Sequence, residues 1–326
     1  MTKWQNKRVL VTGATGLVGS WLVRRLLNEG ASVTALILDS DPASELFRSG
    51  DISKVSVVNG DLADFKAVNR AVLNLENEYI FHLGAQTIVG TALIDPVGSF
   101  TSNIQGTWNI LEAARISNGL VKSIMVASSD KAYGTAKTLP YSEQMPLHGV
   151  GPYDVSKSCT DLVAQSYGKT YQLPVVIARC GNIYGGGDLN WSRIVPGTIK
   201  SLISGEVPLI RSNGKYLRDY IYVEDAVDAY IHMADAVSAG NIPGEAYNFS
   251  RDEPISVLDI YHAISLEVMG EYVEPNILNL AKSEIIDQHL DSTKARKELG
   301  WVSKISLNEG LRRTHNWYRE YFNRGK

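Results

Sequence analysis

Short apolar runs alternate with longer amphipathic stretches through the first 180 residues of the chain. The runs are nearly continuous in Val, Ile and Leu, which is typical of strands buried on both faces. They predict strands at Arg8–Thr12, Ser32–Leu38, Val55–Val58, Tyr79–Leu83, Ser123–Ser128 and Val175–Arg179. Between them, apolar residues at helical spacing predict helices over Leu17–Asn28, Asn103–Ile116 and Val155–Tyr171. This alternation predicts an α/β protein with a doubly wound parallel sheet.

The pattern changes after Cys180, where a glycine-rich stretch and several proline-containing loops separate short mixed elements. Two further helices are predicted, over Val257–Val268 and Ser306–Tyr321. We therefore expect two domains: residues 1–180, which carry the sheet, and residues 181–326, a smaller mixed α/β domain against the carboxyl ends of the strands. This boundary is soft, because a strand from the second part can return to the sheet.

Composition limits the classes of partner. The chain has 326 residues and a formal net charge of −3, which gives no electrostatic reason to expect nucleic acid or an anionic membrane as partner. Its polar N-terminus predicts no signal peptide, and no apolar run reaches the roughly 20 residues of a membrane span. The spacing of Cys159 and Cys180 predicts neither a disulfide framework nor a metal site. We expect a cytoplasmic protein without a metal.

Three glycines, Gly13, Gly16 and Gly19, follow the first strand and open the first helix. Glycines at this spacing permit a tight turn, close approach of the backbone to a pyrophosphate, and close packing of helix on strand. A simple strand–helix turn is the alternative reading. The position between an apolar strand and an amphipathic helix favours a dinucleotide site in a Rossmann-type domain.

Two acidic residues are further candidates for cofactor contacts. Asp61, after the third strand, either accepts a hydrogen bond from the adenine amino group or serves as a turn or N-cap aspartate. Asp39 lies 20 residues beyond Gly19, where an acidic residue binds the ribose 2′-hydroxyl and favours NAD over NADP. It stands two places after the usual position of such a residue, which Ile37 occupies.

A tyrosine and a lysine four residues apart, Tyr153 and Lys157, share one face of a predicted helix. A nearby ammonium lowers the pKa of a phenol from about 10 towards the working pH. The phenol then takes the proton of a substrate hydroxyl while a hydride leaves the carbon. Ser129, which follows a predicted strand, is placed to donate a hydrogen bond to the same hydroxyl. A chance surface pair is the alternative.

With these motifs the chain resembles the extended short-chain dehydrogenase/reductase family that acts on nucleotide sugars. The resemblance covers nearly the whole chain and is carried by Gly13–Gly19, His82–Gln86, Ser128–Gly134, Tyr153–Lys157, Arg179–Gly185, Arg218–Asp225 and Asp291–Ala295. It implies bound NAD, a nucleotide-diphosphate hexose as substrate, and a homodimer formed by the helices predicted over 103–116 and 155–171.

The resemblance also implies individual binding roles. The residues expected to bind the cofactor are Gly13, Thr15, Gly16, Leu17, Val18, Gly19, Asp39, Asp61, Leu62, Leu83, Ala85, Gln86, Asn103, Tyr153 and Lys157. Those expected to bind the substrate are Gln86, Ser129, Asn182, Arg193, Arg211 and Arg218, with Asn182 and Arg218 at the pyrophosphate.

The dipeptide Asp130-Lys131 distinguishes between reactions, because a 4-epimerase of this family needs only the Ser, Tyr and Lys residues. A 4,6-dehydratase also needs a base that removes the C5 proton and an acid that protonates the departing C6 hydroxyl. We assign Lys131 to C5 and Asp130 to C6, and expect that the two side chains do not face each other, since an ion pair would oppose both roles. The Asp-Lys pair resembles the CDP-glucose 4,6-dehydratase branch; a solvated pair at a strand end is the alternative.

Three functions remain open from the sequence. The leading hypothesis is a nucleotide-sugar 4,6-dehydratase with catalytic residues Ser129, Asp130, Lys131, Tyr153 and Lys157. A 4-epimerase or C4 oxidoreductase of the same family is the second, and a non-catalytic NAD-binding scaffold is the third. The segment 218–225 resembles epimerases and decarboxylases, so the nucleotide base and the hexose are not fixed.

Overall fold

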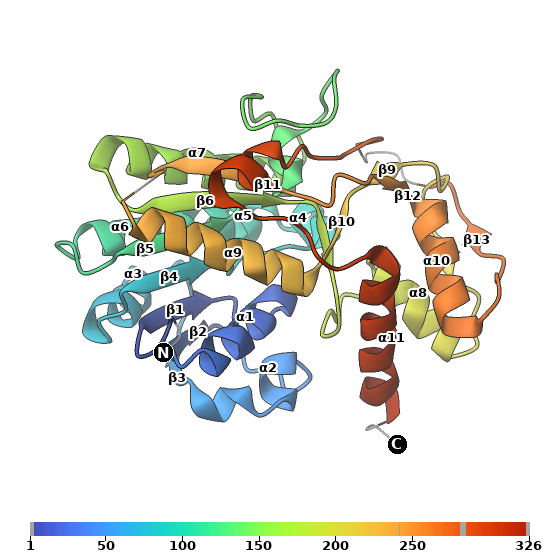
Figure 1. The fold of residues 1–326 in the computed structure, drawn as a ribbon, viewed down its shortest axis with the longest axis horizontal. Helices are drawn as coiled ribbons and strands as arrows, with labels where there is room; N and C mark the ends of the chain where they lie inside the picture. Colours follow the sequence, from blue (N-terminus) through green and yellow to red (C-terminus); the bar gives the residue numbers. More distant parts are fainter. Residues whose placement is uncertain (1–2, 241, 281–284, 324–326) are drawn as a thin grey trace.

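The central layer of the molecule is a seven-stranded parallel sheet in the order β11-β6-β5-β4-β1-β2-β3 (Figure 1). A computed structural model describes residues 3–240, 242–280 and 285–323. The strands are β1 (Arg8–Thr12), β2 (Ser32–Ile37), β3 (Ser56–Asn59), β4 (Tyr79–His82), β5 (Ser123–Ala127), β6 (Val175–Cys180) and β11 (Glu245–Phe249). All six predicted strands are present, and the predicted fold class, a doubly wound parallel sheet, is confirmed.

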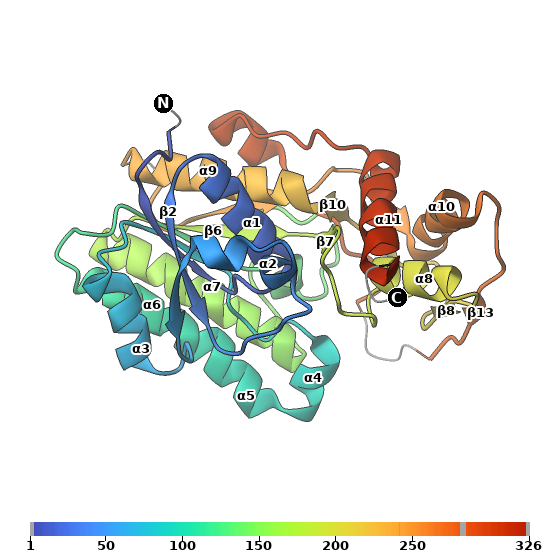
Figure 2. The ribbon, with the colours of Figure 1, turned by 90° about the horizontal axis from the view of Figure 1, so that it is seen from below.

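Helices cover both faces of the sheet (Figure 2). On one face lie α1 (Leu17–Asn28) and α9 (Val223–Ser238), and on the other lie α3 (Phe65–Asn69), α6 (Gly106–Arg115) and α7 (Pro152–Tyr171). Alternate residues of a strand therefore enter different cores: Val9 packs with α1 and α9, whereas Leu10 packs with α6 and α7. This double burial explains the continuous apolar runs in the sequence.

One strand of the sheet and one helix that packs on it come from beyond residue 180. Strand β11 pairs in parallel with β6, so a strand does return to the sheet as foreseen. Helix α9 packs against α1, β5 and β6. The sequence pattern predicted only short mixed elements over this stretch, and for the 16-residue helix α9 this prediction is wrong. The signal was present, because the buried residues Ala226, Tyr230 and Met233 lie at helical spacing. The division at residue 180 stays a prediction, because the sheet layer draws on both sides of it.

The remaining elements form a smaller lobe beside the sheet, on the right of Figure 1. Its helices are α8 (Ile194–Ile203), α10 (Val257–Met269) and α11 (Leu307–Asn323), of which the last two were predicted. Its strands form three short pairs, β7 (Asn182–Tyr184) with β10 (Tyr220–Tyr222), β9 (Leu217–Arg218) with β12 (Ile255–Ser256), and β8 (Leu209–Ile210) with β13 (Asn276–Ile277). The lobe has an apolar core of its own.

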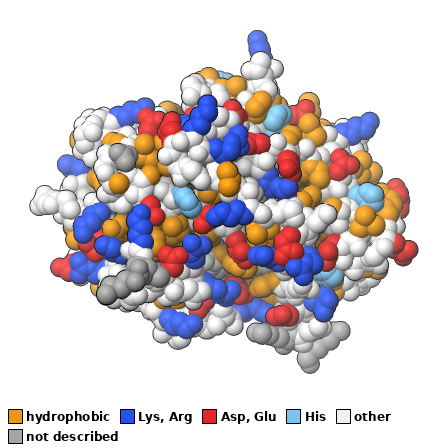
Figure 3. Space-filling model, in the orientation of Figure 1, with side chains coloured by type: hydrophobic (Ala, Val, Ile, Leu, Met, Phe, Trp, Pro, Cys, Tyr) orange, Lys and Arg blue, Asp and Glu red, His pale blue; other side chains and the backbone are white. Residues whose placement is uncertain are grey.

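Shorter helical elements complete the described part of the chain. These are α2 (Glu45–Arg48), α4 (Val89–Ile94), α5 (Pro96–Phe100), 3-10 turns at Asp51–Lys54 and Asp130–Tyr133, and π-helical turns at Arg70–Asn74, Thr101–Gln105 and Ala295–Leu299. Within the described residues, no helix is both long and apolar enough to cross a membrane. Basic and acidic side chains are interspersed over the face shown in Figure 3.

A buried ion pair ties α7 to β6. Asp161 and Arg179 are 0% and 2% exposed, and two hydrogen bonds of 2.8 Å join the Nε and Nη2 atoms of Arg179 to the carboxylate. The Nη1 atom of Arg179 donates to the hydroxyl of Tyr133 at 2.7 Å, and that hydroxyl donates to Asn248 Oδ1 at 2.7 Å. One network therefore links α7, β6, the turn at 130–133 and β11.

Asp161→Ala is expected to lower the free energy of unfolding by about 3–5 kcal/mol, because the buried guanidinium of Arg179 would lose its charged partner. Urea unfolding followed by circular dichroism measures the loss. Glu253→Ala is the matched control, since Glu253 pairs with Arg251 at a largely exposed position and should cost less than about 1 kcal/mol. Equal losses in the two variants would contradict a structural role for the buried pair.

Candidate active site

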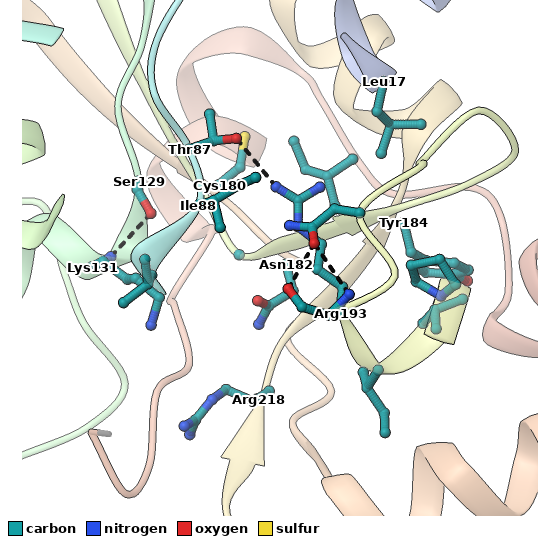
Figure 4. Close-up of a pocket in the computed structure, with 18 of the residues that line it drawn as sticks. Leu17, Thr87, Ile88, Ser129, Lys131, Cys180, Asn182, Tyr184, Arg193 and Arg218 are labelled. Atoms are coloured by element: carbon teal, nitrogen blue, oxygen red, sulfur yellow. Dashed lines mark hydrogen bonds between the residues drawn. The ribbon is translucent and has the colours of Figure 1, made fainter. Parts of the chain in front are cut away.

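A cavity of about 900 Å³ lies between the carboxyl ends of the sheet strands and the smaller lobe (Figure 4). This is the position at which doubly wound sheets bind their ligands. Most of the residues predicted from the sequence line it: Gly13, Thr15, Gly16, Leu17, Val18, Gly19, Leu83, Ala85, Ser129, Asp130, Lys131, Tyr153, Lys157, Asn182, Arg193, Arg211 and Arg218. Five others, Asp39, Asp61, Leu62, Gln86 and Asn103, are not among its lining residues.

The glycine-rich turn forms one end of the cavity. Gly13 has a φ of +68°, and a Cβ atom there would stand 2.8 Å from the backbone nitrogen of Gly84. A Cβ at Gly19 would stand 2.0 Å from the carbonyl oxygen of Gly13, so both positions require glycine. Helix α1 begins at Leu17 without a side-chain cap, which leaves N–H groups of its first turn for a ligand. These residues fit the pyrophosphate of a dinucleotide.

The two acidic candidates lie outside the cavity wall. Asp39 is exposed, two residues beyond the end of β2 at Ile37. The Oδ1 atom of Asp61 accepts a hydrogen bond from the backbone nitrogen of Ala63 at 2.9 Å, which is the turn-forming alternative. Leu62 packs against Gly84 behind the glycine-rich turn. Their contacts with a cofactor stay predictions.

Asn103 braces the loop after β4. Its Oδ1 atom accepts from the backbone nitrogen of Gln86 at 2.7 Å, and its Nδ2 atom donates to the Gln86 carbonyl at 3.0 Å and to Ser156 Oγ at 2.8 Å. The Gln86 side chain accepts from the backbone nitrogen of Ile88 at 2.8 Å. In this structure both predicted ligand-binding amides bind protein atoms, so Asn103 acts on the cavity by holding the loop.

Four of the predicted catalytic residues meet where β5 ends and α7 begins. Ser129 Oγ donates to Asp130 Oδ1 at 3.0 Å and accepts from the Lys131 backbone nitrogen at 3.2 Å, and it lies close enough to the phenol of Tyr153 to oppose the rise in the pKa of that group. Helix α7 starts at Pro152, which puts Tyr153 in its first turn and Lys157 one turn later. The ammonium of Lys157 donates to the Ala127 carbonyl at 2.8 Å.

Burial sets the pKa values of this pair, and one expectation is wrong. Burial raises the pKa of Tyr153 to about 12; the charge of Arg193 opposes the rise and that of Asp130 adds to it. The four-residue spacing suggested that Lys157 lowers the phenol pKa towards the working pH, but in this structure burial dominates and the pKa is raised. Burial lowers the pKa of Lys157 to about 8, and Asp161 opposes that change. Tyr153 needs a further positive charge nearby before it can act as a base.

Asp130 and Lys131 contact different partners. Burial raises the pKa of Asp130, against the charge of Lys131 and the hydrogen bond from Ser129, which favours the protonated form that an acid needs. The Nζ atom of Lys131 donates to Gln288 Oε1 at 3.0 Å. Among the described contacts no ion pair joins Asp130 to Lys131, in agreement with the expectation that they do not face each other. Their assignment to C6 and C5 stays a prediction.

Three arginines, Arg193, Arg211 and Arg218, line the cavity, and Figure 4 labels the first and the last of them. Arg193 pairs with Asp188 at 2.9 Å, and Arg211 is exposed. Arg218 is buried and donates to the carbonyls of residues 285 and 286 at 2.6 Å. Asn182 Nδ2 donates to the Asp219 carbonyl at 3.2 Å. Three guanidinium groups along one cavity suit the binding of a diphosphate.

Two residues near the catalytic side chains were given no role from the sequence. Gln288 reaches Lys131 across 157 residues, and the carboxyl of Asp219, which follows Arg218, has its pKa raised to about 7 by burial. His82, by contrast, lies between Thr12 and Thr107 at 2.9 and 3.1 Å, and burial lowers its pKa to about 3. These contacts give His82 a structural role.

The fold and the site together define an extended short-chain dehydrogenase/reductase. A family model described as GDP-mannose 4,6 dehydratase matches residues 10–314. The chain belongs to this family, and the predicted resemblance is confirmed.

Similar proteins include both dehydratases and epimerases. The chain is 30% identical to a CDP-glucose 4,6-dehydratase of Salmonella typhimurium, over 98% of this chain and 92% of the relative. It is 31% identical to a UDP-glucose 4-epimerase of Mycolicibacterium smegmatis, over 96% and 98%. Among solved structures, the dTDP-glucose 4,6-dehydratase DesIV of Streptomyces venezuelae, which was solved with NAD bound, has a TM-score of 0.85 and 28% identity, and 98% of each chain is covered.

Lys157→Met is expected to remove a pH dependence of stability. At pH 7 the lysine is charged in both folded and unfolded protein; as the pH rises, the folded protein releases the proton near 8, before the unfolded protein does near 10.5. The free energy of unfolding should therefore rise by about 1 kcal/mol between about pH 7 and pH 9 in the parent protein. Urea unfolding of the cofactor-free protein at the two pH values measures this rise.

The rise should be lost in Lys157→Met and kept in Lys66→Met, which replaces an exposed lysine of α3. The same rise in both variants would show that Lys157 is not the titrating group.

Proposed function

We propose that this protein is an NAD-dependent nucleotide-sugar 4,6-dehydratase. The observation that carries the proposal is the pair Asp130 and Lys131, an acid with a raised pKa and an amine, both lining the same cavity as Tyr153. An oxidation and a reduction at one carbon need only the tyrosine; the additional acid and base suit an elimination. We further propose that the enzyme works in the cytoplasm, in keeping with its two free cysteines.

The glycine-rich turn and the first turn of α1 would hold the cofactor pyrophosphate, with Leu83 and Ala85 beside the dinucleotide. When bound, NAD supplies the hydride acceptor for C4, the hydride donor for C6 and, in its oxidised form, a positive ring that favours the phenolate. Tyr153 lies at the junction of β5 and α7, where Ser129 reaches its hydroxyl. This junction is therefore the place for the sugar C4 hydroxyl.

The side chains act in sequence on the sugar. Tyr153 takes the proton of the C4 hydroxyl, and Ser129 holds that oxygen. The C4 ketone acidifies C5, whose proton passes to Lys131, while Asp130 protonates the C6 oxygen, which leaves as water. A hydride then returns to C6, and Lys131 returns its proton to C5. The proton collected by Tyr153 replaces the one that Asp130 gave up, so one water is lost and the protein is restored.

The arginine side of the cavity would bind the diphosphate of the substrate. Asn182 and Arg218 are the proposed pyrophosphate ligands, with Arg193 and Arg211 nearby and Ser129 towards the sugar. The CDP-glucose 4,6-dehydratase relative supports CDP-glucose as a candidate. GDP-, UDP- and dTDP-hexoses are the other candidates, because the contacts that would distinguish the bases are expected from loops of the smaller lobe, for which no motif names the residues.

A 4-epimerase or C4 oxidoreductase is the second candidate, and the 31% identity to a UDP-glucose 4-epimerase favours it. In that case Asp130 and Lys131 only tune the site. A non-catalytic NAD-binding scaffold is the third, but it gives no reason for Ser129, Tyr153 and Lys157 to meet at one cavity.

Incubation of the purified protein with CDP-, GDP-, UDP- and dTDP-glucose, and with GDP-mannose, is expected to convert one of them to a product lighter by one water, seen by mass spectrometry. In Lys131→Met, NADH absorbance should still appear after substrate addition, while water loss falls at least about 100-fold, because the C5 base is missing. Thr135→Ala, an exposed change nearby in sequence, is the control and should keep both steps.

Other outcomes decide between the alternatives. An isomer of unchanged mass would support an epimerase, and no conversion of any sugar would support a scaffold. Water loss at the parent rate in Lys131→Met would refute the role assigned to this lysine.

We also propose a homodimer formed through α6 and α7. Large apolar side chains are exposed on these helices and on the neighbouring α4 and α5: Leu93 is 60% exposed, Ile94 87%, Val97 71%, Trp108 43% and Leu162 54%. An apolar surface of this kind on adjacent helices suits a second copy of the same chain.

Leu162→Glu is expected to convert a dimer into a monomer at micromolar concentration, because a charge would enter the apolar contact. Size-exclusion chromatography with light scattering measures the mass. Val207→Glu is the matched control, since Val207 is 60% exposed on the smaller lobe. A monomeric parent protein, or a dimeric Leu162→Glu variant, would contradict the proposed interface.

A further inference from the structure

A short segment of residues 285–291, here called the strap, runs between β9 and the turn at Asp130–Tyr133, here called the catalytic turn. It is held on both sides by hydrogen bonds. These join Gln288 N to Leu217 O (3.0 Å), Leu217 N to Asp287 Oδ1 (3.0 Å), Tyr141 N to His289 O (2.8 Å), Asp291 N to Tyr141 O (2.9 Å) and Leu290 N to Asp219 Oδ2 (2.6 Å). The strap is therefore part of the rigid wall behind the cavity.

One side chain of the strap reaches the catalytic turn. Gln288 is 0% exposed, and its Oε1 atom accepts a hydrogen bond from Lys131 Nζ at 3.0 Å. Lys131 itself lines the cavity. A lysine has four rotatable bonds and large conformational freedom, so a buried acceptor at its tip restricts where the nitrogen can stand.

We propose that Gln288 is a positioning residue for Lys131, which holds the side-chain nitrogen by a neutral amide so that it can serve as the base at C5. This inference rests on the proposed dehydratase function. A carboxylate at the same place would stabilise the charged ammonium, which cannot accept a proton. An amide accepts from the ammonium through its oxygen and, after a rotation, donates to the free amine through its nitrogen. It can therefore accompany the lysine through both protonation states.

The charged and titratable groups around Lys131 explain why a neutral partner matters. Asp130 lies in the same turn and Asp154 on α7, and the charge of Lys131 acts on both carboxyls. Burial raises the pKa of each of these acids, which limits the negative charge that faces the lysine. The charge of Arg218 on β9 acts on Asp130 as well, and His289 follows Gln288 on the strap. A third carboxylate in place of Gln288 would shift this balance towards the ammonium.

The strap also connects the base to the diphosphate side of the cavity. The carbonyls of residues 285 and 286 accept from the Arg218 guanidinium, three and two residues before Gln288, which accepts from Lys131. Residue 288 further forms a parallel bridge with Arg218. The distance between the arginine that would hold the pyrophosphate and the lysine at C5 is thus set by one short piece of backbone.

Gln288→Glu tests the inference, because it keeps the shape and adds the charge. We expect the acid limb of the pH profile for water loss to move up by about one unit or more, so that the rate at pH 7 falls about tenfold and recovers at higher pH. The NADH absorbance formed in the first step should keep its pH profile. Asp287→Asn, a change of one charge in the same strap that keeps the acceptor for Leu217, is the control and should not move the limb.

Gln288→Met covers the case in which the glutamate variant does not fold. It removes the acceptor without adding charge, so water loss should fall about tenfold at every pH while the first step is kept. Unchanged profiles in Gln288→Glu, or parent rates of water loss in Gln288→Met, would overturn the positioning role.

A direct titration separates this inference from the proposed function. The lysines are reductively methylated with ¹³C-formaldehyde, and the NMR signal missing in Lys131→Met identifies residue 131. Its titration should move to higher pH by about one unit in Gln288→Glu, whether or not any sugar is dehydrated. A titration that does not move overturns the inference, whereas absence of water loss in the parent protein, with a titration that moves, overturns only the dehydratase.

Discussion

The buried ion pair between Asp161 and Arg179 is the constraint on which the site depends. Two buried charges cost several kcal/mol to remove from water, and only close, fully hydrogen-bonded geometry offsets that cost. Here both bonds are 2.8 Å, and the remaining guanidinium nitrogen reaches Tyr133. Because Asp161 is on α7 and Arg179 on β6, the pair fixes the helix that carries Tyr153 and Lys157 against the sheet. Tyr133 extends the same network to the turn that carries Asp130 and Lys131.

Burial also explains the chemistry that this frame makes possible. The same removal from water raises the pKa of Asp130 and lowers that of Lys157 to about 8, so each is moved towards its neutral form. Tyr153 is moved away from ionisation, to a pKa of about 12. To ionise, the phenol thus needs a positive charge from a ligand, whereas Asp130, the proposed acid, has a raised pKa without one. A site of this kind favours proton transfer only once the cavity is filled.

The sequence was sufficient for those parts of the fold and site that depend on local patterns. The bounds of β1 and α1 and the approach of Tyr153 to Ser129 follow from apolar periodicity, glycine spacing and the pitch of one helix. Contacts between distant segments were beyond it: Gln288 has no pattern that marks it as a partner of Lys131, and Asn103 looks like any helical amide. Helix α9 was missed for a different reason, since its periodicity was present among glycines and prolines that suggested loops.

The strap shows why such distant contacts matter for a reaction with several steps. The proposed oxidation at C4 would use residues at the ends of β5 and α7, which are fixed to the sheet core, whereas the proposed diphosphate site belongs to β9 and the smaller lobe. The proposed elimination needs these two parts in register, because the C5 proton must meet Lys131 when the nucleotide is held by Arg218. The strap accepts hydrogen bonds from both side chains and so fixes the position of Lys131 relative to Arg218. Substrate specificity and proton transfer therefore share a structural element that neither the catalytic turn nor the arginine side contains.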